Sequence, residues 1–247
     1  RQGLQQPYGK PSGKSVSLDF GASGRQVTPT PEYAKATGVD TVVYQLNKTA
    51  KDRAAFVEKM RQAQSSRGAV GKSVDVYDPK DYQGYKLFST QDGAGGFAIS
   101  PSGELSSVVS LKGSGLKGFS DSAISAGVAN GARWLNAFDT VLPNKYGRFG
   151  FKPVARLKFD ENFARSDWGD KAVDEFMKET SAFNDGKPDL VFTNQIKSFI
   201  TQMELNAFKT NIDTVPSSFE IYHPKAIAPA ELLQLVPPVL RQYIQVT

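Results

Sequence analysis

The chain contains no cysteine, and His223 is the single histidine among its 247 residues. Without cysteine it can form no disulfide, no thiolate metal site and no cysteine nucleophile. One histidine also excludes a metal centre built from several of them. A Ser-His-Asp triad would have to use His223. That residue stands in a short segment that Pro224 ends, so we interpret it as a surface or strand-end histidine.

Long apolar runs are missing as well. No run approaches the ~20 residues that a membrane-spanning helix needs, and no signal-peptide pattern opens the chain. We therefore expect no membrane partner and a cytoplasmic location. The first residue is Arg1 rather than Met. The alternative expectation is that the chain is a processed fragment of a larger viral or secreted polypeptide. If that polypeptide is viral, we expect the chain to be associated with the virion.

Charge of one sign is only mildly in excess. The 30 lysines and arginines face 25 aspartates and glutamates, which gives a formal charge of +5. This excess suits an anionic ligand. It forms no stretch in which basic and aromatic residues alternate, so nucleic acid is an unlikely partner.

Composition divides the chain into three parts. Residues 1–40 are rich in Gly, Pro, Ser and Gln, which predicts an extended N-terminal arm. Residues 41–165 mix strand and helix patterns, including a hairpin around the turn at 101–103. Residues 166–247 carry helical periodicity at 171–183, 194–209 and 229–245, which predicts a helical C-terminal extension. The expected fold class is α/β of the α+β kind, with a mixed, mostly antiparallel twisted sheet flanked by helices.

A glycine- and lysine-bearing turn at residues 112–118 (Lys-Gly-Ser-Gly-Leu-Lys-Gly) lies between a predicted strand and a predicted helix. Glycine allows positive φ angles and lets a ligand approach the backbone closely. Amide groups at a helix start favour an anion, with help from the helix dipole. Lys112 and Lys117 would add positive charge. The pattern is typical of a phosphate site, and a flexible surface loop is the alternative.

Two other segments resemble the ATP-binding P-loop but fail its requirements. Residues 68–73 end in Gly-Lys-Ser, but Ser66 stands where the motif needs glycine, and the segment follows a predicted helix instead of a strand. Residues 9–15 have one spacer residue too few and no strand before them. We interpret neither segment as a nucleotide site.

A second motif, Tyr-Gly-Arg-Phe-Gly-Phe, occupies residues 146–151. It follows an apolar strand pattern at 133–139 and a short helix that Pro143 opens. It leads into a further strand pattern at 151–159. Taken alone, Tyr146 would be a packing residue with its hydroxyl at the surface. Its place after the phosphate-type turn makes it a candidate for chemistry.

With these two motifs, residues from about 41 to 160 resemble the GNAT superfamily of acyl-CoA-dependent N-acetyltransferases. The family pattern has a hairpin strand, an Arg/Gln-x-x-Gly-x-Gly/Ala turn and a helix that takes the CoA pyrophosphate. A further strand and a short helix carrying Tyr-x-x-x-Gly-Phe follow. Residues 110–115 (Ser-Leu-Lys-Gly-Ser-Gly) match the turn except at Ser110, where the family usually has Arg or Gln. Asp139 and Thr140 stand where the family commonly has asparagine.

The resemblance implies acetyl-CoA as co-substrate, an amine as acceptor and no metal. Tyr146 would protonate the leaving thiolate. Glu104 and Asp139 are the available bases for the amine. A backbone amide near Val109 or Ser110 would polarise the thioester carbonyl. The residues expected to contact the cofactor are Val109, Ser110, Lys112, Gly113, Ser114, Gly115, Leu116, Lys117 and Gly118.

Three functions remain open at the level of sequence. The first is an active acetyltransferase whose acceptor is the amine of a small molecule or a protein. The second is a GNAT-like domain without activity that serves as a structural or binding module. In either case the C-terminal helices would be able to hold a second copy or a partner protein. The third, a nucleic-acid-binding protein, ranks last.

Overall fold

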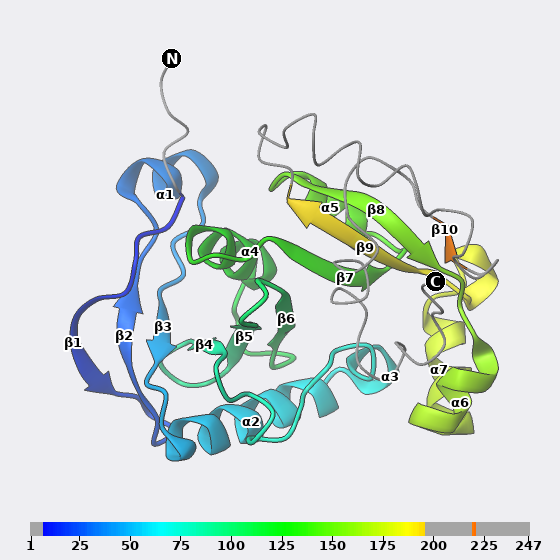
Figure 1. Ribbon diagram of the computed structural model, residues 1–247, viewed down its shortest axis with the longest axis horizontal. Coiled ribbons are helices and arrows are strands. Elements are labelled where there is room, and N and C mark those ends of the chain that lie inside the picture. The colour runs from blue at the N-terminus through cyan, green and yellow to red at the C-terminus, as the bar shows by residue number, and fades with distance from the viewer. Residues whose placement is uncertain (1–6, 196–218, 221–247) are drawn as a thin grey trace. The chain divides into compact units, whose positions relative to one another are not determined.

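The computed structural model describes residues 7–195 and 219–220 (Figure 1). The chain forms two compact units, unit 1 from Arg1 to Arg133 and unit 2 from Trp134 to Thr247. Each unit has its own antiparallel sheet. In the part of the chain that is described, no helix is long and apolar enough to span a bilayer.

Unit 1 is built on a sheet whose neighbouring strands follow the order of the chain and pair antiparallel throughout. Its strands are β1 (Ser12–Ser17), β2 (Ser23–Val27), β3 (Val43–Leu46), β4 (Lys86–Ser89), β5 (Gly95–Ile99) and β6 (Leu105–Ser110). The hairpin expected around residues 101–103 is confirmed, because β5 and β6 pair across that turn.

The first 40 residues differ from the expected extended arm. From residue 12 on they contribute β1, β2 and the helix α1 (Pro31–Thr37) to unit 1. Few apolar residues suffice here because β1 is an exposed edge strand. β2 is fixed by main-chain pairing with β3 and by the fully buried Val27. Composition alone underestimates such strands, since backbone hydrogen bonds carry much of their pairing.

Helices cover both faces of this sheet (Figure 1). A Cβ atom placed on Gly95 would lie 2.8 Å from the ring of Phe119 in α4 (Phe119–Ala129), and one placed on Gly96 would lie 2.7 Å from Met60 in α2 (Ala50–Ser65). Successive strand residues point to opposite faces. The two helices therefore sandwich β5, and glycine at both positions allows their close approach.

The start of the helix α2 is fixed by a capping threonine. Thr49 caps it by accepting a hydrogen bond from the amide of Asp52 at 3.1 Å. Its apolar stripe of Phe56, Val57, Met60 and Ala63 is buried against the sheet. After α2 ends, Gly68 begins the single-turn helix α3 (Gly68–Gly71).

Unit 2 has a sheet in which β9 lies between β7 and β8. Its strands are β7 (Trp134–Phe138), β8 (Phe151–Leu157), β9 (Leu190–Gln195) and β10 (Phe219–Glu220). Its helices are α5 (Leu142–Gly147), α6 (Glu161–Trp168), α7 (Asp170–Glu179) and a short 3-10 turn, η1 (Asn184–Gly186). An aromatic cluster of Phe138, Phe159, Trp168 and Phe176 joins the sheet to α6 and α7.

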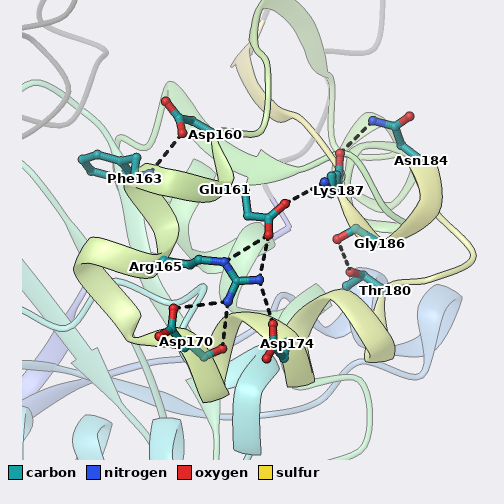
Figure 2. A network of polar contacts seen from close by, with 10 residues as sticks. All are labelled: Asp160, Glu161, Phe163, Arg165, Asp170, Asp174, Thr180, Asn184, Gly186 and Lys187. Atoms are coloured by element: carbon teal, nitrogen blue, oxygen red, sulfur yellow. Dashed lines mark hydrogen bonds and ion pairs between the residues drawn. The ribbon is translucent and has the colours of Figure 1, made fainter.

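A network centred on Arg165 holds the corner between α6 and α7 (Figure 2). The guanidinium lies 2.7 Å from Glu161 and 2.8 Å from Asp174, and Lys187 approaches the other oxygen of Glu161 at 2.6 Å. These hydrogen bonds, first from Lys187 and then from Arg165, hold the pKa of Glu161 below its ordinary value. The network orders the region that follows β8.

The expected fold class is confirmed at the level of a mixed α/β chain with antiparallel sheet flanked by helices. The C-terminal extension is not purely helical, because β9 and β10 belong to it. Residues 194–195, expected to begin a helix, end β9. The rest of that helix, to residue 209, and the one expected at 229–245 lie outside the described residues.

Candidate functional site

The glycine- and lysine-bearing turn lies in unit 1, between β6 and α4, and is largely exposed. Gly113, Gly115 and Gly118 have φ angles of 82°, 77° and 67°. A Cβ atom at any of the three would meet nothing within 4 Å. Crowding therefore does not explain the glycines. The left-handed backbone does, because side-chain-bearing residues adopt it rarely.

Some backbone amides of this turn donate hydrogen bonds within unit 1. Ser114 donates to the carbonyl of Leu111 at 3.2 Å and Lys117 to that of Gly115 at 2.8 Å. Within the described part of the chain, the amides of Gly113, Gly115, Leu116 and Gly118 have no hydrogen-bond partner. Exposed amides can bond to water or to an anion.

The start of α4 adds to this arrangement. Gly118 is the N-cap residue and provides no side-chain cap, so no hydroxyl or carboxylate at that position competes for the first amides of the helix. Lys112 and Lys117 are exposed on the turn and add positive charge. Asp121, half-buried in the first helical turn, opposes them. The balance favours an anion at the turn.

The end of α2 reaches this turn, which the sequence did not indicate. The guanidinium of Arg67 donates to the carbonyl and to the hydroxyl of Ser110, both at 2.8 Å. The hydroxyl of Ser66 accepts from the amide of Lys112 at 2.9 Å. These partners are more than 40 residues apart. Only the pairing order of the sheet brings them together, so no local pattern could have revealed them.

The strand β6 contains a bulge beside the expected carbonyl-polarising amides. Ala98 pairs with Ser106 but Gly96 pairs with Val109, so β6 has one more residue than β5 over this stretch. Ser107 has a φ of 56°, which is rare for a residue with a side chain. A bulge leaves an extra residue outside the ladder. The resemblance expects the carbonyl-polarising amide near Val109 or Ser110, and the bulge lies just before them.

Polar contacts hold the bulge from one side of the sheet. The hydroxyl of Ser107 lies 2.6 Å from that of Tyr82 and donates to the carbonyl of Asp75 at 2.7 Å. The ring of Tyr82 contacts those of Tyr77 and Tyr85, with centroids 5.5 and 5.3 Å apart. The cluster of Tyr77, Tyr82 and Tyr85 therefore supports the strained backbone of Ser107 through the hydroxyl of Tyr82.

Glu104 lies at the start of β6 and is almost fully buried, with 9% of its surface exposed. Its amide donates to the hydroxyl of Ser100 at 3.0 Å and its carbonyl accepts from the amide of Ser100 at 2.9 Å. Burial first, and then the negative charges of Asp75 and Glu104, raise the pKa of Tyr77 far above its ordinary value. Ser106 pairs with Ala98, which lies in the same core cluster as Tyr82. Glu104, two residues before Ser106, therefore points to the face of the sheet that carries the tyrosine cluster.

Tyr146 belongs to α5 in unit 2, and the turn belongs to unit 1. Its side chain is buried, and burial raises its pKa to about 12. The phenol is therefore protonated at neutral pH. A group in that state can donate a proton but cannot serve as a base.

Asp139, the other expected base, is engaged in an ion pair. It accepts from Arg156 at 2.5 Å, and the same guanidinium binds Asp189 at 2.8 Å. The amide of Asp139 also donates to the carbonyl of Asp189 at 2.7 Å. The carboxylate of Asp139 is therefore already engaged by a cation of the chain. The arrangement is that of a structural link between β7, β8 and the segment before β9.

A surface hollow of about 750 Å³ runs along α2, lined by helix residues from Ala54 to Ser66 and by Pro79. Ser66, at its end, is the residue whose hydroxyl meets the amide of Lys112. Among the described residues, no group of three or more His, Asp or Glu side chains is arranged to hold a metal ion.

Comparison with protein-family models, with curated proteins and with solved structures found no match to this chain.

Proposed function

We infer that the chain is an acetyl-CoA-dependent acyltransferase of the GNAT type, which moves an acetyl group to an amine. The observation that carries this proposal is the exposed turn with its left-handed glycines and its four amides that have no partner among the described residues. A diphosphate would satisfy those amides and meet the positive end of α4. Lys112 and Lys117 would neutralise part of its charge.

The order of elements supports the same proposal. The hairpin strand β6 leads through the turn into α4, then into β7, into the short helix α5 with Tyr146, and into β8. This is the succession that the resemblance requires. The bulge at Ser107 adds support, because it interrupts the ladder where a thioester carbonyl would need a donor.

In the proposed reaction, CoA supplies the activated acetyl group. The protein orients the reactants and provides the electrostatic environment of the reaction. Glu104 takes a proton from the ammonium of the acceptor, directly or through water. The amine nitrogen then attacks the thioester carbonyl, whose oxygen is stabilised by a backbone amide of the bulged strand. The carbon–sulfur bond breaks, and the departing thiolate takes the proton that the resemblance assigns to Tyr146. The nitrogen loses its second proton to solvent, and solvent returns a proton to the phenolate. The products are an acetamide and free CoA.

A GNAT-like module without activity is the second candidate function. The ion pair of Asp139 with Arg156 favours it, because that pair leaves Glu104 as the sole candidate base. Such a module would still bind CoA or a partner protein. The C-terminal region expected to hold a second copy or a partner lies mainly outside the described residues.

Calorimetry with acetyl-CoA tests the binding half of the proposal. We expect micromolar affinity in the wild type. The variant Gly115→Glu should abolish it, because it places a carboxylate where the diphosphate would lie. Gly115→Asn is the matched control, since asparagine tolerates the left-handed backbone and adds no charge. Equal binding by all three proteins would reject the turn as the site.

A thiol-release assay with a mixture of small amines and lysine peptides then separates the two candidate functions. Amine-dependent release of CoA supports the transferase. Tight binding without release supports the inactive module. No binding of acetyl-CoA by the wild type would reject both.

A further inference from the structure

Three hydrogen bonds join the end of α2 to the end of β6. Arg67 Nε donates to the carbonyl of Ser110, Arg67 Nη2 donates to its hydroxyl, and the amide of Lys112 donates to Ser66 Oγ. Ser66 Oγ also donates to the carbonyl of Ala63 at 2.6 Å. The helix terminus is thus joined to the first residues of the glycine turn.

The backbone around Arg67 is fixed by glycines that the P-loop-like segment supplies. Gly68 has a φ of 62°, which turns the chain out of α2. A Cβ atom on Gly71 would lie only 2.0 Å from the carbonyl oxygen of Gln64. The single-turn helix α3 therefore packs directly against the end of α2. This packing holds the Cα atom of Arg67 beside the turn. It also explains why glycines occur in the segment at residues 68–73.

The guanidinium of Arg67 has capacity left for a ligand. A guanidinium carries five N–H donors in a rigid plane, and Ser110 takes two of them along one edge. Arg67 is an exposed residue. The opposite edge of the plane can therefore receive a phosphate, whose oxygens match the spacing of paired N–H groups.

Position 110 is also the place where the turn lacks a basic side chain of its own. Ser110 precedes Lys112 and the three left-handed glycines, and it is the point on which Arg67 converges. A serine cannot neutralise a diphosphate, but a guanidinium held on that serine can.

We propose that Arg67, which lies between α2 and α3, is a phosphate-binding residue of the turn and supplies the charge that position 110 lacks. The ligand group it recognises is a diphosphate or a similar phosphate ester. This inference rests on the proposed function for the identity of the ligand as CoA. Its geometry, with the guanidinium bound to Ser110 at the end of β6, does not depend on that identity.

A purely structural role for Arg67 makes a different prediction. If Arg67 only anchors α2 to β6, its loss would weaken every ligand of the site alike, charged or not. If it binds phosphate, its loss would weaken phosphate-bearing ligands and spare phosphate-free ones. Arg67→Gln separates the roles further, because an amide can still donate to the carbonyl of Ser110 but carries no charge.

The experiment measures binding of CoA, inorganic pyrophosphate and pantetheine by calorimetry, for the wild type, Arg67→Ala, Arg67→Gln and Arg67→Lys. Arg53→Ala is the matched control. Arg53 lies at the other end of α2 and also donates to backbone carbonyls, of Pro79 and Lys48. We expect Arg67→Ala and Arg67→Gln to bind CoA and pyrophosphate roughly 10- to 100-fold more weakly, with pantetheine unchanged. Arg67→Lys should recover part of the loss, and Arg53→Ala should match the wild type.

The outcomes separate this inference from the proposed function. Wild-type binding of CoA that Arg67→Gln leaves unchanged overturns the role of Arg67 and keeps the function. An equal loss for CoA and pantetheine in Arg67→Gln also overturns it, in favour of the structural anchor. Binding of pyrophosphate that needs Arg67, without binding of CoA, keeps the phosphate site and rejects the transferase. Absence of binding to both phosphate probes rejects both proposals.

Discussion

At the scale of single residues, the chemistry proposed here depends on the protonation state of one phenol. Burial holds the pKa of Tyr146 at about 12, so its proton is retained at every pH at which an acyltransferase would work. We expect Tyr146→Phe to lower kcat by roughly 10²- to 10⁴-fold, because the leaving thiolate loses its donor. The Kd for acetyl-CoA should stay unchanged. Steady-state kinetics and calorimetry on the same samples provide both numbers.

Tyr8→Phe is the matched control for this variant. Tyr8 is also buried, burial raises its pKa to about 12, and its hydroxyl donates to the carbonyl of Thr41 at 2.8 Å. It takes no part in the proposed reaction, so kcat should be retained. Wild-type turnover in Tyr146→Phe would remove Tyr146 from the mechanism. Because the protonated phenol is the active form, Tyr146 should cause no alkaline fall in kcat below about pH 11.

Some site residues were predictable from sequence and others were not, for a physical reason. The glycines of the turn were recognisable because a left-handed backbone restricts the residue type locally. Arg67 and the strained Ser107 were not, because their roles arise from partners far away in the chain. Asp139 was chosen as a base from its place at a strand end. The guanidinium that engages it comes from the next strand of the chain, β8.

At the scale of elements, the packing of α3 on α2 is the contact most sensitive to a single methyl group. A Cβ atom on Gly71 would overlap the carbonyl of Gln64, and both sides of the clash are backbone or fixed to it. We expect Gly71→Ala to destabilise unit 1 by about 1–3 kcal/mol, since overpacking forces backbone shifts. Amide hydrogen exchange along α2 and thermal denaturation would measure the effect. The same backbone shift should displace Arg67. We therefore expect Gly71→Ala to bind pyrophosphate more weakly than the wild type.

The same substitution at Gly147 should have the opposite sign. Gly147 ends α5, its φ is not positive, and a Cβ atom there would meet nothing within 4 Å. Alanine would therefore reduce the freedom of the unfolded chain without strain, which stabilises by ~0.4–1 kcal/mol. If Gly71→Ala were as stable as Gly147→Ala, the packing of α3 on α2 would not fix the position of Arg67.

Elements with strong local signals were the ones the sequence predicted correctly. The helix α2 has a capping threonine and a regular apolar stripe, and the β5–β6 hairpin has its turn residues. The strands β1 and β2 have neither, so an extended arm was expected in their place. Their partner β3 begins only at Val43, and pairing with a later strand leaves no trace in composition.

At the scale of the whole molecule, the division into two units could not be read from residue patterns. Hydrophobic periodicity identifies helices and strands, but it does not say which strands share a sheet. The strands β6 and β7 lie on either side of α4 in the sequence, yet they belong to different sheets. Helices flanking an antiparallel sheet were predictable from the alternation of patterns, whereas the pairing order in unit 2, with β9 between β7 and β8, was not.

Both units share a sensitivity to alkali that follows from their buried phenols. Burial, the largest cause in each case, raises the pKa values of Tyr8 and Tyr82 in unit 1 and of Tyr146 in unit 2 to about 12. An unfolded tyrosine titrates near 10. Between these values the folded chain binds more protons than the unfolded chain, so the free energy of unfolding falls as pH rises.

We therefore expect full stability below about pH 10 and a progressive loss between about pH 10 and pH 12, on the order of 1–3 kcal/mol for each buried phenol. Denaturant unfolding at stepped pH measures this loss, and tyrosinate absorbance of the folded protein reports the titration itself. Tyr8→Phe should reduce the alkaline loss in unit 1, because a phenylalanine ring has no proton to release. If all nine tyrosines titrated near pH 10 while the chain stayed folded, burial of these hydroxyls would be rejected.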